Sequence, residues 1–466
     1  MNQVARTFIL VGIVVVALLA LHHLPRLTVG DTELRPVNIL SDLLPESDDM
    51  HPSLADILIP EAPVPQAVVS DTDSVADSVV QVKPVVPPGV TMIADYGQGM
   101  AGGMDHFYRQ LLRVNELGRP VRIAYFGDSF IEGDILTCDL REQLQTLYGG
   151  CGVGWVDCAS QVYGFRQTVS HSFTGLTEYE VVKRPFSTQA QGIAQRYFVP
   201  DDSVNTWFQY RGTTARKHLS EWQRASFFFR SEGGFSLATR LNSDTTIYEQ
   251  VAGSPSLQVL THHHASMSRV TYTVSHASAR TYLYGVALEG QTGVIVDNFS
   301  MRGSSGATLG SIPTSTLQAF AAQRPYDLLV FHFGLNVASD KSQAGYKSYT
   351  HQMGEAIRHL RQAYPEASVL IVSMPDRDQR DASGIHTMVG VEQLVAHQQV
   401  MASEQQVAFF NLFQAMGGRE SMMALVDDGV ANKDYTHLTF AGGRRLAKLL
   451  VKSLQAGVDN YKIMHP

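Results

Sequence analysis

The stretch that decides the fold is Ile123-Ala124-Tyr125-Phe126-Gly127-Asp128-Ser129. A short apolar strand ends here at a glycine, and a helical pattern follows with leucines from Leu136 to Leu147 on one face. Asp134 is predicted to be the N-cap of that helix. Active sites of open α/β sheets gather where strands end and helices begin. Ser129 is therefore predicted to be a nucleophile.

Further short apolar segments follow in the second half of the chain, each separated from the next by a helical pattern. They are Val294–Phe299, Asp327–Phe333, Ser368–Met374 and Val407–Leu412. Strands of a parallel sheet are buried on both faces and therefore appear as continuous apolar runs. The alternation predicts a parallel sheet covered by helices on both faces.

Residues 163–290 have a different character, with short runs rich in Thr, Ser, Tyr, Phe and Val. Examples are Ser226–Phe229, Arg269–Val274 and Thr281–Val286. Because this region interrupts the α/β pattern after its first strand, it is predicted to be an inserted β-sandwich-like module. Its aromatic residues either stack on sugar rings or form the core of the module; the candidates are Tyr163, Phe165, Trp207, Tyr210 and Trp222.

Asp434-Tyr-Thr-His437 stands directly before a last helical pattern, Leu438–Leu454. A serine hydroxyl is a weak nucleophile until a base removes its proton, and histidine suits that task near neutral pH. His437 is the predicted base for Ser129. The Asp434 carboxylate is predicted to orient the imidazole and to stabilise its protonated form.

Two other motifs supply groups for an oxyanion hole. Gly306 ends the run Arg302-Gly-Ser-Ser-Gly306, and Asn336 ends Phe333-Gly-Leu-Asn336. The backbone amides of Ser129 and Gly306 and the side-chain amide of Asn336 present N–H donors without adding charge. They are the predicted donors to the oxyanion of a tetrahedral intermediate.

Composition limits the classes of function. The 466 residues are 44% apolar and carry a net charge of -8, which argues against a nucleic-acid partner. Three cysteines are too few for a disulfide scaffold, and both a Cys151–Cys158 bridge with free Cys138 and three free thiols are compatible with the sequence. No metal site is predicted at His262-His263-His264, because consecutive residues of a strand point to alternate faces. No cofactor is predicted.

The chain is predicted to consist of five segments. Residues 1–27 are strongly apolar and are predicted to be an uncleaved signal anchor that spans the membrane, with a cleaved signal peptide as the alternative. A flexible linker rich in Pro, Asp and Ser follows. The predicted boundaries are 28–95 for the linker, 96–162 for the first part of the α/β domain, 163–290 for the module and 291–466 for the second part of the α/β domain.

Together the motifs resemble the SGNH or GDSL-like hydrolases, whose four blocks carry Ser, Gly, Asn and His in this order. The resemblance covers Val121 to Gln161 and Gly293 to about Val451. It implies a flavodoxin-like three-layer α/β/α fold and serine-dependent deacylation without a metal. Ser305-Gly306-Ala-Thr308 is similar to the end of the second block, although Met301 stands where that block carries asparagine.

Within that group, the inserted module resembles that of the periplasmic peptidoglycan O-acetylesterases. The resemblance implies an esterase that removes small acyl groups, above all O-acetyl, from cell-wall or other polysaccharide. It also implies an extracytoplasmic, periplasmic location with tethering to the inner membrane. Two alternatives stay open: an O-acetyltransferase that uses the same Ser129 acyl-enzyme, with a membrane-bound acyltransferase as partner, and a non-catalytic carbohydrate-binding scaffold.

Overall fold

The computed structural model describes residues 54–63 and 84–465 except 202, 245 and 383, and the backbone of four short strands. These strands are β1 (Thr28–Val29), β2 (Thr32–Glu33), β3 (Gln66–Val69) and β4 (Ser78–Gln81). The chain forms two compact units, Met1–Pro52 and Ser53–Pro466, and every described helix lies in the second. None of the described helices is both long enough and apolar enough to span a membrane. Residues 1–27, the predicted signal anchor, lie outside the described residues.

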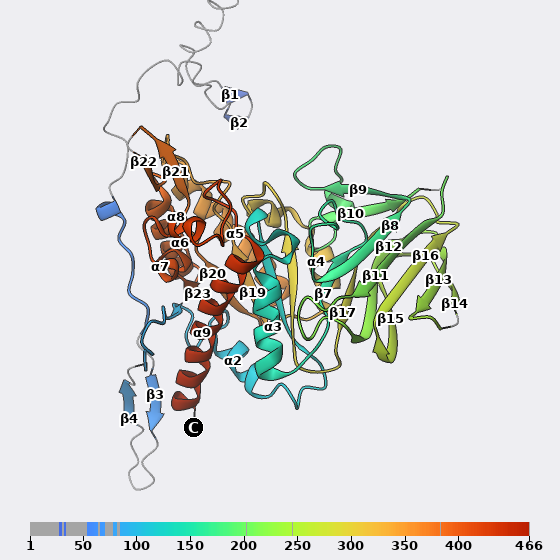
Figure 1. Ribbon diagram of the computed structural model, residues 1–466, viewed down its shortest axis with the longest axis horizontal. Helices are drawn as coiled ribbons and strands as arrows, with labels where there is room; N and C mark the ends of the chain where they lie inside the picture. The colour runs from blue at the N-terminus through green and yellow to red at the C-terminus, as the bar shows by residue number, and fades with distance from the viewer. Residues whose placement is uncertain are drawn as a thin grey trace, which may run out of the picture. The chain divides into compact units, whose positions relative to one another are not determined.

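A six-stranded sheet forms the centre of the α/β domain (Figure 1). From edge to edge its strands are β18 (Val294–Ser300), β6 (Val121–Gly127), β19 (Leu328–His332), β20 (Ser368–Val372), β23 (Ala408–Phe410) and β5 (Ala94–Asp95). All neighbours pair in parallel except β23 and β5, which are antiparallel. The predicted parallel sheet is confirmed, with strand ends shifted by one or two residues.

Helices cover both faces of this sheet. Strands β6, β19 and β20 are therefore buried along their whole length. Helix α3 packs against α9, and Figure 1 shows the two side by side, whereas α5 packs against α4 and α6. The helices are α2 (Asp105–Leu112), α3 (Thr137–Tyr148), α4 (Thr314–Gln323), α5 (Tyr346–Ala363), α6 (Val391–Glu404), α7 (Leu412–Met416), α8 (Ser421–Asp427) and α9 (Phe440–Met464). Short 3₁₀ segments are η2 (Leu54–Asp56), η3 (Ser129–Asp134), η4 (Thr188–Ala190) and η5 (Ala307–Ser311).

The inserted module consists of two antiparallel sheets that pack over a core of their own. One contains β15 (Ser254–Met267), β12 (Trp222–Ser231), β17 (Thr281–Glu289), β10 (Arg196–Pro200) and β9 (Leu176–Glu180), and β7 (Gly154–Asp157) pairs with β17. The other contains β14 (Ile247–Val251), β13 (Phe235–Leu241), β16 (Arg269–Ser275), β11 (Thr206–Gly212) and β8 (Val169–Thr174). The predicted sandwich-like insertion is confirmed, and it lies between β6 and β18 of the α/β sheet. A hairpin of β21 (Asp378–Asp381) and β22 (Gly384–Thr387) lies in the α/β domain.

The end of the predicted linker is ordered against the α/β domain. Ala94 and Asp95 form β5 and pair with β23. Further upstream, the backbone N–H of Val85 donates to the side chain of Asn460 in α9 at 2.9 Å. The predicted linker therefore includes residues that the sheet and α9 hold in place.

Asp134 is not the N-cap of α3, so that prediction is wrong. The N-cap is Leu136, and Asp134 is fully buried beside Arg141 at 2.9 Å and Arg166 at 3.2 Å. Burial alone would raise the pKa of Asp134, but the two guanidinium groups outweigh it and hold the pKa below its ordinary value. The carboxylate therefore serves as an ionic tie between α3 and the first residues of the module.

A buried network of charges joins the module to the sheet. Glu289, at the end of β17, contacts Arg122 of β6 at 2.8 Å and Arg324 at 3.0 Å. Arg324 also contacts Asp297 of β18 at 2.6 Å. Burial would raise the pKa of Glu289, but Arg324 and Arg122 hold it below its ordinary value. These pairs connect segments that are far apart in sequence.

Arg324→Ala is expected to lower the free energy of unfolding by about 3–5 kcal/mol, because it leaves the Asp297 and Glu289 carboxylates buried with fewer cations. Urea denaturation of the unmodified chain and of Arg324→Ala measures this difference. Arg445→Ala, which removes an exposed pair between Arg445 of α9 and Asp428 after α8, is the control and should cost at most about 1 kcal/mol. Equal losses in the two variants would contradict the importance of the buried network.

Candidate active site

The predicted nucleophile stands at the carboxyl end of β6, where η3 begins. Gly127 is required here, because a Cβ would lie 2.8 Å from the Ile131 side chain and 3.0 Å from the carbonyl oxygen of His332. The Asp128 side chain accepts a hydrogen bond from the backbone N–H of Phe130 at 2.9 Å and caps the turn. Ser129 is half-buried.

Ser129, His437 and Asp434 form a continuous hydrogen-bonded line. Ser129 Oγ lies 3.0 Å from His437 Nε2, and His437 Nδ1 lies 2.8 Å from Asp434 Oδ2. Asp434 Oδ1 also accepts from the backbone N–H groups of Thr436 and His437, both at 3.0 Å. These two bonds fix the Asp-x-x-His turn, so that both side chains project from one loop toward Ser129.

The charge of Asp434 is stabilised by this geometry. Partial burial would raise its pKa, but hydrogen bonds from the backbone N–H and ring of His437 and from the N–H of Thr436 hold the pKa below its ordinary value. The Asp434 side chain is 49% exposed and that of His437 is 36% exposed, so solvent reaches the pair. The arrangement suits a base that is oriented by an ionised carboxylate.

Gly306 and Asn336, the two predicted oxyanion donors besides Ser129, both donate to Ser304, a residue that was not predicted from the sequence. Asn336 Nδ2 donates to the Ser304 carbonyl oxygen at 3.0 Å, and the Gly306 N–H donates to Ser304 Oγ at 3.0 Å. An amide side chain has two N–H donors, so Asn336 keeps one for a ligand. The N–H of Gly306 is engaged by the Ser304 hydroxyl oxygen. Nothing in the spacing of the motif distinguishes Ser304 from its neighbours.

Gly306 occupies a position that only glycine tolerates. Its φ is +88°, and a Cβ would lie 2.7 Å from the Phe333 ring and 2.8 Å from Met353 Sδ. Tyr349 donates to the carbonyl oxygen of the preceding Ser305 at 3.0 Å and holds the same loop. The loop after β18 is therefore fixed against the end of β19, beside the nucleophile.

Asp128 and His332 lie beneath the site and are both buried. Burial raises the pKa of Asp128 to about 6, although the Phe130 N–H opposes this effect. Burial lowers the pKa of His332 to about 3, and its Nδ1 lies 3.0 Å from the Tyr125 hydroxyl. His332 is therefore a neutral packed residue and not a second base.

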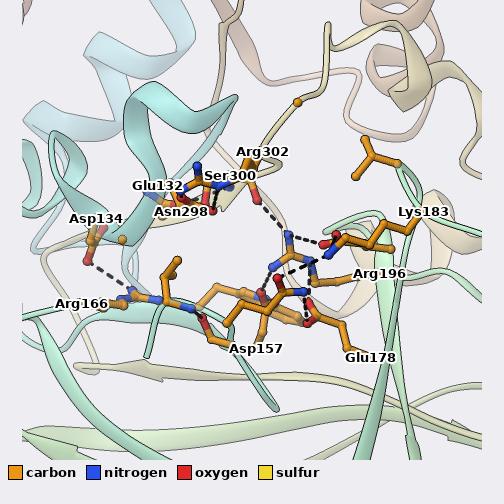
Figure 2. A pocket seen from close by; sticks show the side chains of 18 residues that line it. Glu132, Asp134, Asp157, Arg166, Glu178, Lys183, Arg196, Asn298, Ser300 and Arg302 are labelled. Carbon is orange, nitrogen blue, oxygen red and sulfur yellow. Dashed lines mark hydrogen bonds and ion pairs between the residues drawn. The ribbon is translucent and has the colours of Figure 1, made fainter. Parts of the chain in front are cut away.

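A cavity of about 590 Å³ lies between η3, the end of β18 and the module, and it is called the junction cavity because both parts of the fold line it. Ser129, Asp434 and His437 are not among its lining residues. Glu132 and Gly133 of η3 and Arg302 and Gly303 after β18 form one wall. The module contributes the other wall, in which Figure 2 shows Arg196 among Asp157, Glu178 and Lys183. The cavity thus begins three residues after Ser129 in η3.

The aromatic residues considered for sugar stacking divide into two groups. Tyr210 and Trp222 are buried in the core of the module. Tyr163 and Phe165 are about half exposed, and Trp207 is half-buried on β11. Stacking on sugar therefore remains a prediction only for the second group.

The remaining sequence candidates are held in ordinary contacts. His262 lies 3.3 Å from Glu249, and His264 lies 3.3 Å from Asp244. Within the described part of the chain, no group of three or more His, Cys, Asp or Glu side chains could hold a metal ion. The cysteines are free thiols, so the bridge that the sequence left open is absent.

Comparison with known proteins identifies the fold. No protein-family model matches the chain, and no curated protein matches it. Among solved structures, the one described as "Peptidoglycan O-acetylesterase in action, 5 min" has a TM-score of 0.64 and 22% identity, and it covers 79% of this chain and 99% of that chain. The chain shares the fold of a peptidoglycan O-acetylesterase. The resemblance and the three-layer fold expected from the sequence are thereby confirmed.

Other solved structures are similar over smaller parts of the chain. A family two carbohydrate esterase from Cellvibrio japonicus has a TM-score of 0.26 and 8% identity over 63% of this chain and 99% of that chain. A lipase/acylhydrolase from Enterococcus faecalis has a TM-score of 0.25 and 18% identity over 35% of this chain and 76% of that chain. TM-scores this low carry no argument about the site.

Proposed function

We propose that the chain is a serine esterase of the SGNH type that removes small acyl groups, above all O-acetyl, from cell-wall or other polysaccharide. The observation that carries the proposal is the hydrogen-bonded line from Ser129 through His437 to Asp434. It lies where the strands of the sheet end, which is the usual place for an active site in such folds. The fold shared with a peptidoglycan O-acetylesterase supports the choice of a glycan ester.

The proposed reaction has two halves. Ser129 Oγ attacks the ester carbonyl carbon while His437 Nε2 accepts the hydroxyl proton, and collapse of the tetrahedral intermediate returns that proton to the departing sugar oxygen. Water then attacks the acyl-enzyme and gives a proton to His437. The second collapse restores the Ser129 hydroxyl and releases the carboxylic acid.

Three N–H groups are proposed to stabilise the intermediate: those of Ser129, Gly306 and Asn336. The Ser304 contacts support this role, because they bring the Gly306 and Asn336 donors to one loop. Rotation of the Ser304 hydroxyl would free the Gly306 N–H as charge develops on the substrate oxygen.

Asn336→Ala is expected to lower kcat by about 10²–10³, because one oxyanion donor is lost. Steady-state rates on a simple acetyl ester measure the effect. Asn205→Ala, at an exposed position of the module, is the matched control and should leave the rate unchanged. A loss of less than tenfold in Asn336→Ala would assign the donor role elsewhere.

The first test uses the full chain with an O-acetylated glycan or a simple acetyl ester, with and without a sugar acceptor, and measures free acetate. Acetate release that depends on Ser129 and does not change with acceptor supports the esterase. Acetylated acceptor formed at the expense of acetate would mean a transferase, which shares the acyl-enzyme. Sugar binding without turnover of any ester would mean a non-catalytic scaffold.

The proposed location is the periplasm, with residues 1–27 as the tether to the inner membrane. This proposal rests on the apolar sequence of those residues, and the linker that follows gives the domain reach. Protease added to intact spheroplasts should degrade the chain. Protection from protease until the cells are lysed would contradict this location.

A further inference from the structure

The junction cavity lies at the same edge of the sheet as Ser129. Strand β18 pairs in parallel with β6, and Ser300 stands opposite Gly127, so both strands end at the same edge of the sheet. Ser300 lines the cavity, and Ser129 follows Gly127 by two residues. A glycan that places its ester at Ser129 can therefore continue past the end of β18 toward the module.

The charges of the cavity are paired with one another. Arg196 lies 2.6 Å from Asp157, and Lys183 lies 2.6 Å from Glu180. On the opposite wall Arg302 pairs with Glu132, as Figure 2 shows. Arg166, the remaining cation of the lining, pairs with Asp134. Because each of these cations already has a carboxylate partner, the walls offer no unpaired cation to an anionic ligand.

The same walls keep hydrogen-bonding capacity for a neutral ligand. Glu178 Oε2 accepts from Gln161 Nε2 at 3.0 Å, and Glu178 Oε1 lies 3.9 Å from the buried Arg196 Nε. An ionised carboxylate has about four acceptor sites. A carboxylate that contacts one guanidinium therefore keeps acceptor sites for other donors. Hydroxyl groups of a ligand can therefore donate to Glu178 without breaking an ion pair. Val162 and Val182 add apolar surface for the carbon-bound faces of a sugar.

We infer that the junction cavity binds an uncharged sugar unit next to the unit that carries the acyl ester. The volume of about 590 Å³ lies within the range of small-molecule sites, roughly 300–1,000 Å³. Because Glu178, Lys183 and Arg196 belong to the module, the module forms part of the substrate site. This inference rests on the proposed function.

Val182→Trp tests the inference by filling the cavity. Val182 lines the cavity and is 40% exposed, so a larger side chain there need not disturb the core. The variant is expected to lower kcat/KM on a neutral O-acetylated trisaccharide about 10- to 100-fold through KM, because the sugar loses several hydrogen bonds. Its kcat/KM on 4-nitrophenyl acetate should be unchanged, because that ester has no adjoining sugar.

Val204→Trp is the matched control, since Val204 is 49% exposed on the same module and does not line the cavity. It should behave as the unmodified chain on both esters. The unmodified chain should also prefer the neutral trisaccharide acetate to an acetylated uronic-acid trisaccharide, because the paired walls favour a neutral ligand.

Equal activity of Val182→Trp and the unmodified chain on the trisaccharide would overturn the inference, as would an equal loss on both esters. A preference for the uronic-acid ester would overturn the neutral-sugar assignment. An unmodified chain that hydrolyses neither ester would contradict the proposed esterase itself. Failure of the inference and failure of the function are thus distinguishable.

Discussion

Ser129→Ala is expected to lower kcat/KM on an acetyl ester by at least about 10⁴-fold, because the nucleophile is removed while the rest of the site stays in place. Among the described residues the Ser129 hydroxyl makes one hydrogen bond, to His437, and Ser129 is only half-buried. Its loss should change the free energy of unfolding by about 1 kcal/mol. Acetate release and thermal unfolding, measured on the same preparation, separate the two effects.

His437→Ala should lower kcat/KM on the same ester by a similar factor, because the nucleophile and its base act as a unit and their effects do not add. Combining it with Ser129→Ala should therefore cost little more than either change alone. Ser348→Ala, on an exposed position of α5, is the matched control and should retain full activity. Full activity in Ser129→Ala or His437→Ala, or unfolding of both variants, would contradict the assignment.

Asp434→Asn is expected to lower kcat by about 10³–10⁴. The amide has nearly the same shape, so Oδ1 can still accept from the backbone N–H groups of Thr436 and His437. The oxygen that faces His437 Nδ1 at 2.8 Å loses its negative charge or becomes an N–H donor. The imidazole is then no longer held in the tautomer that accepts the Ser129 proton, and its protonated form is not stabilised.

The loss in Asp434→Asn should appear in kcat more than in KM, because the charge matters chiefly when the imidazole is protonated. Asp427→Asn, at the exposed end of α8, is the matched control for a loss of charge in the same region. A change in kcat of less than tenfold would mean that another group orients His437.

The lowered pKa of Asp434 adds a dependence of stability on pH. A carboxyl whose pKa is lower in the folded than in the unfolded chain contributes stability above the unfolded pKa, and this stability is lost as pH falls through the folded pKa. The hydrogen bonds of Asp434 should therefore persist into the acid range. Because half of the side chain is exposed, its contribution to stability is small.

Much of the site could be predicted because each motif adjoins a strand or helix that local sequence specifies. The strand β6 is buried along its length and, except for Arg122, has no charged side chain, and the motif follows directly at its end. The same holds for Asn336 after β19 and for His437 before α9. The order of the motifs and the parallel arrangement of the strands place these residues at one edge of the sheet.

The errors of prediction arose where a side chain contacts distant parts of the chain. Asp134 has the residue type and position of an N-cap, but Arg166 comes from the first residues of the module and the carboxylate is buried in an ionic tie. For Trp222 the sequence left sugar stacking and the core of the module open, and the structure places it in the core. Local periodicity contains no information about which partner an individual polar or aromatic side chain meets.

The sequence by itself indicated the candidate nucleophile, its candidate base and a parallel sheet with an inserted module, since these depend on apolar runs and on the short motifs that end them. Only the tertiary structure decided that Ser304 engages both Gly306 and Asn336, that Glu289 ties the module to the sheet, and that a cavity with paired charges lies between the two. Each of these features joins atoms from segments far apart in the chain. Their geometry depends on packing of the whole domain, which a local pattern of residues does not specify.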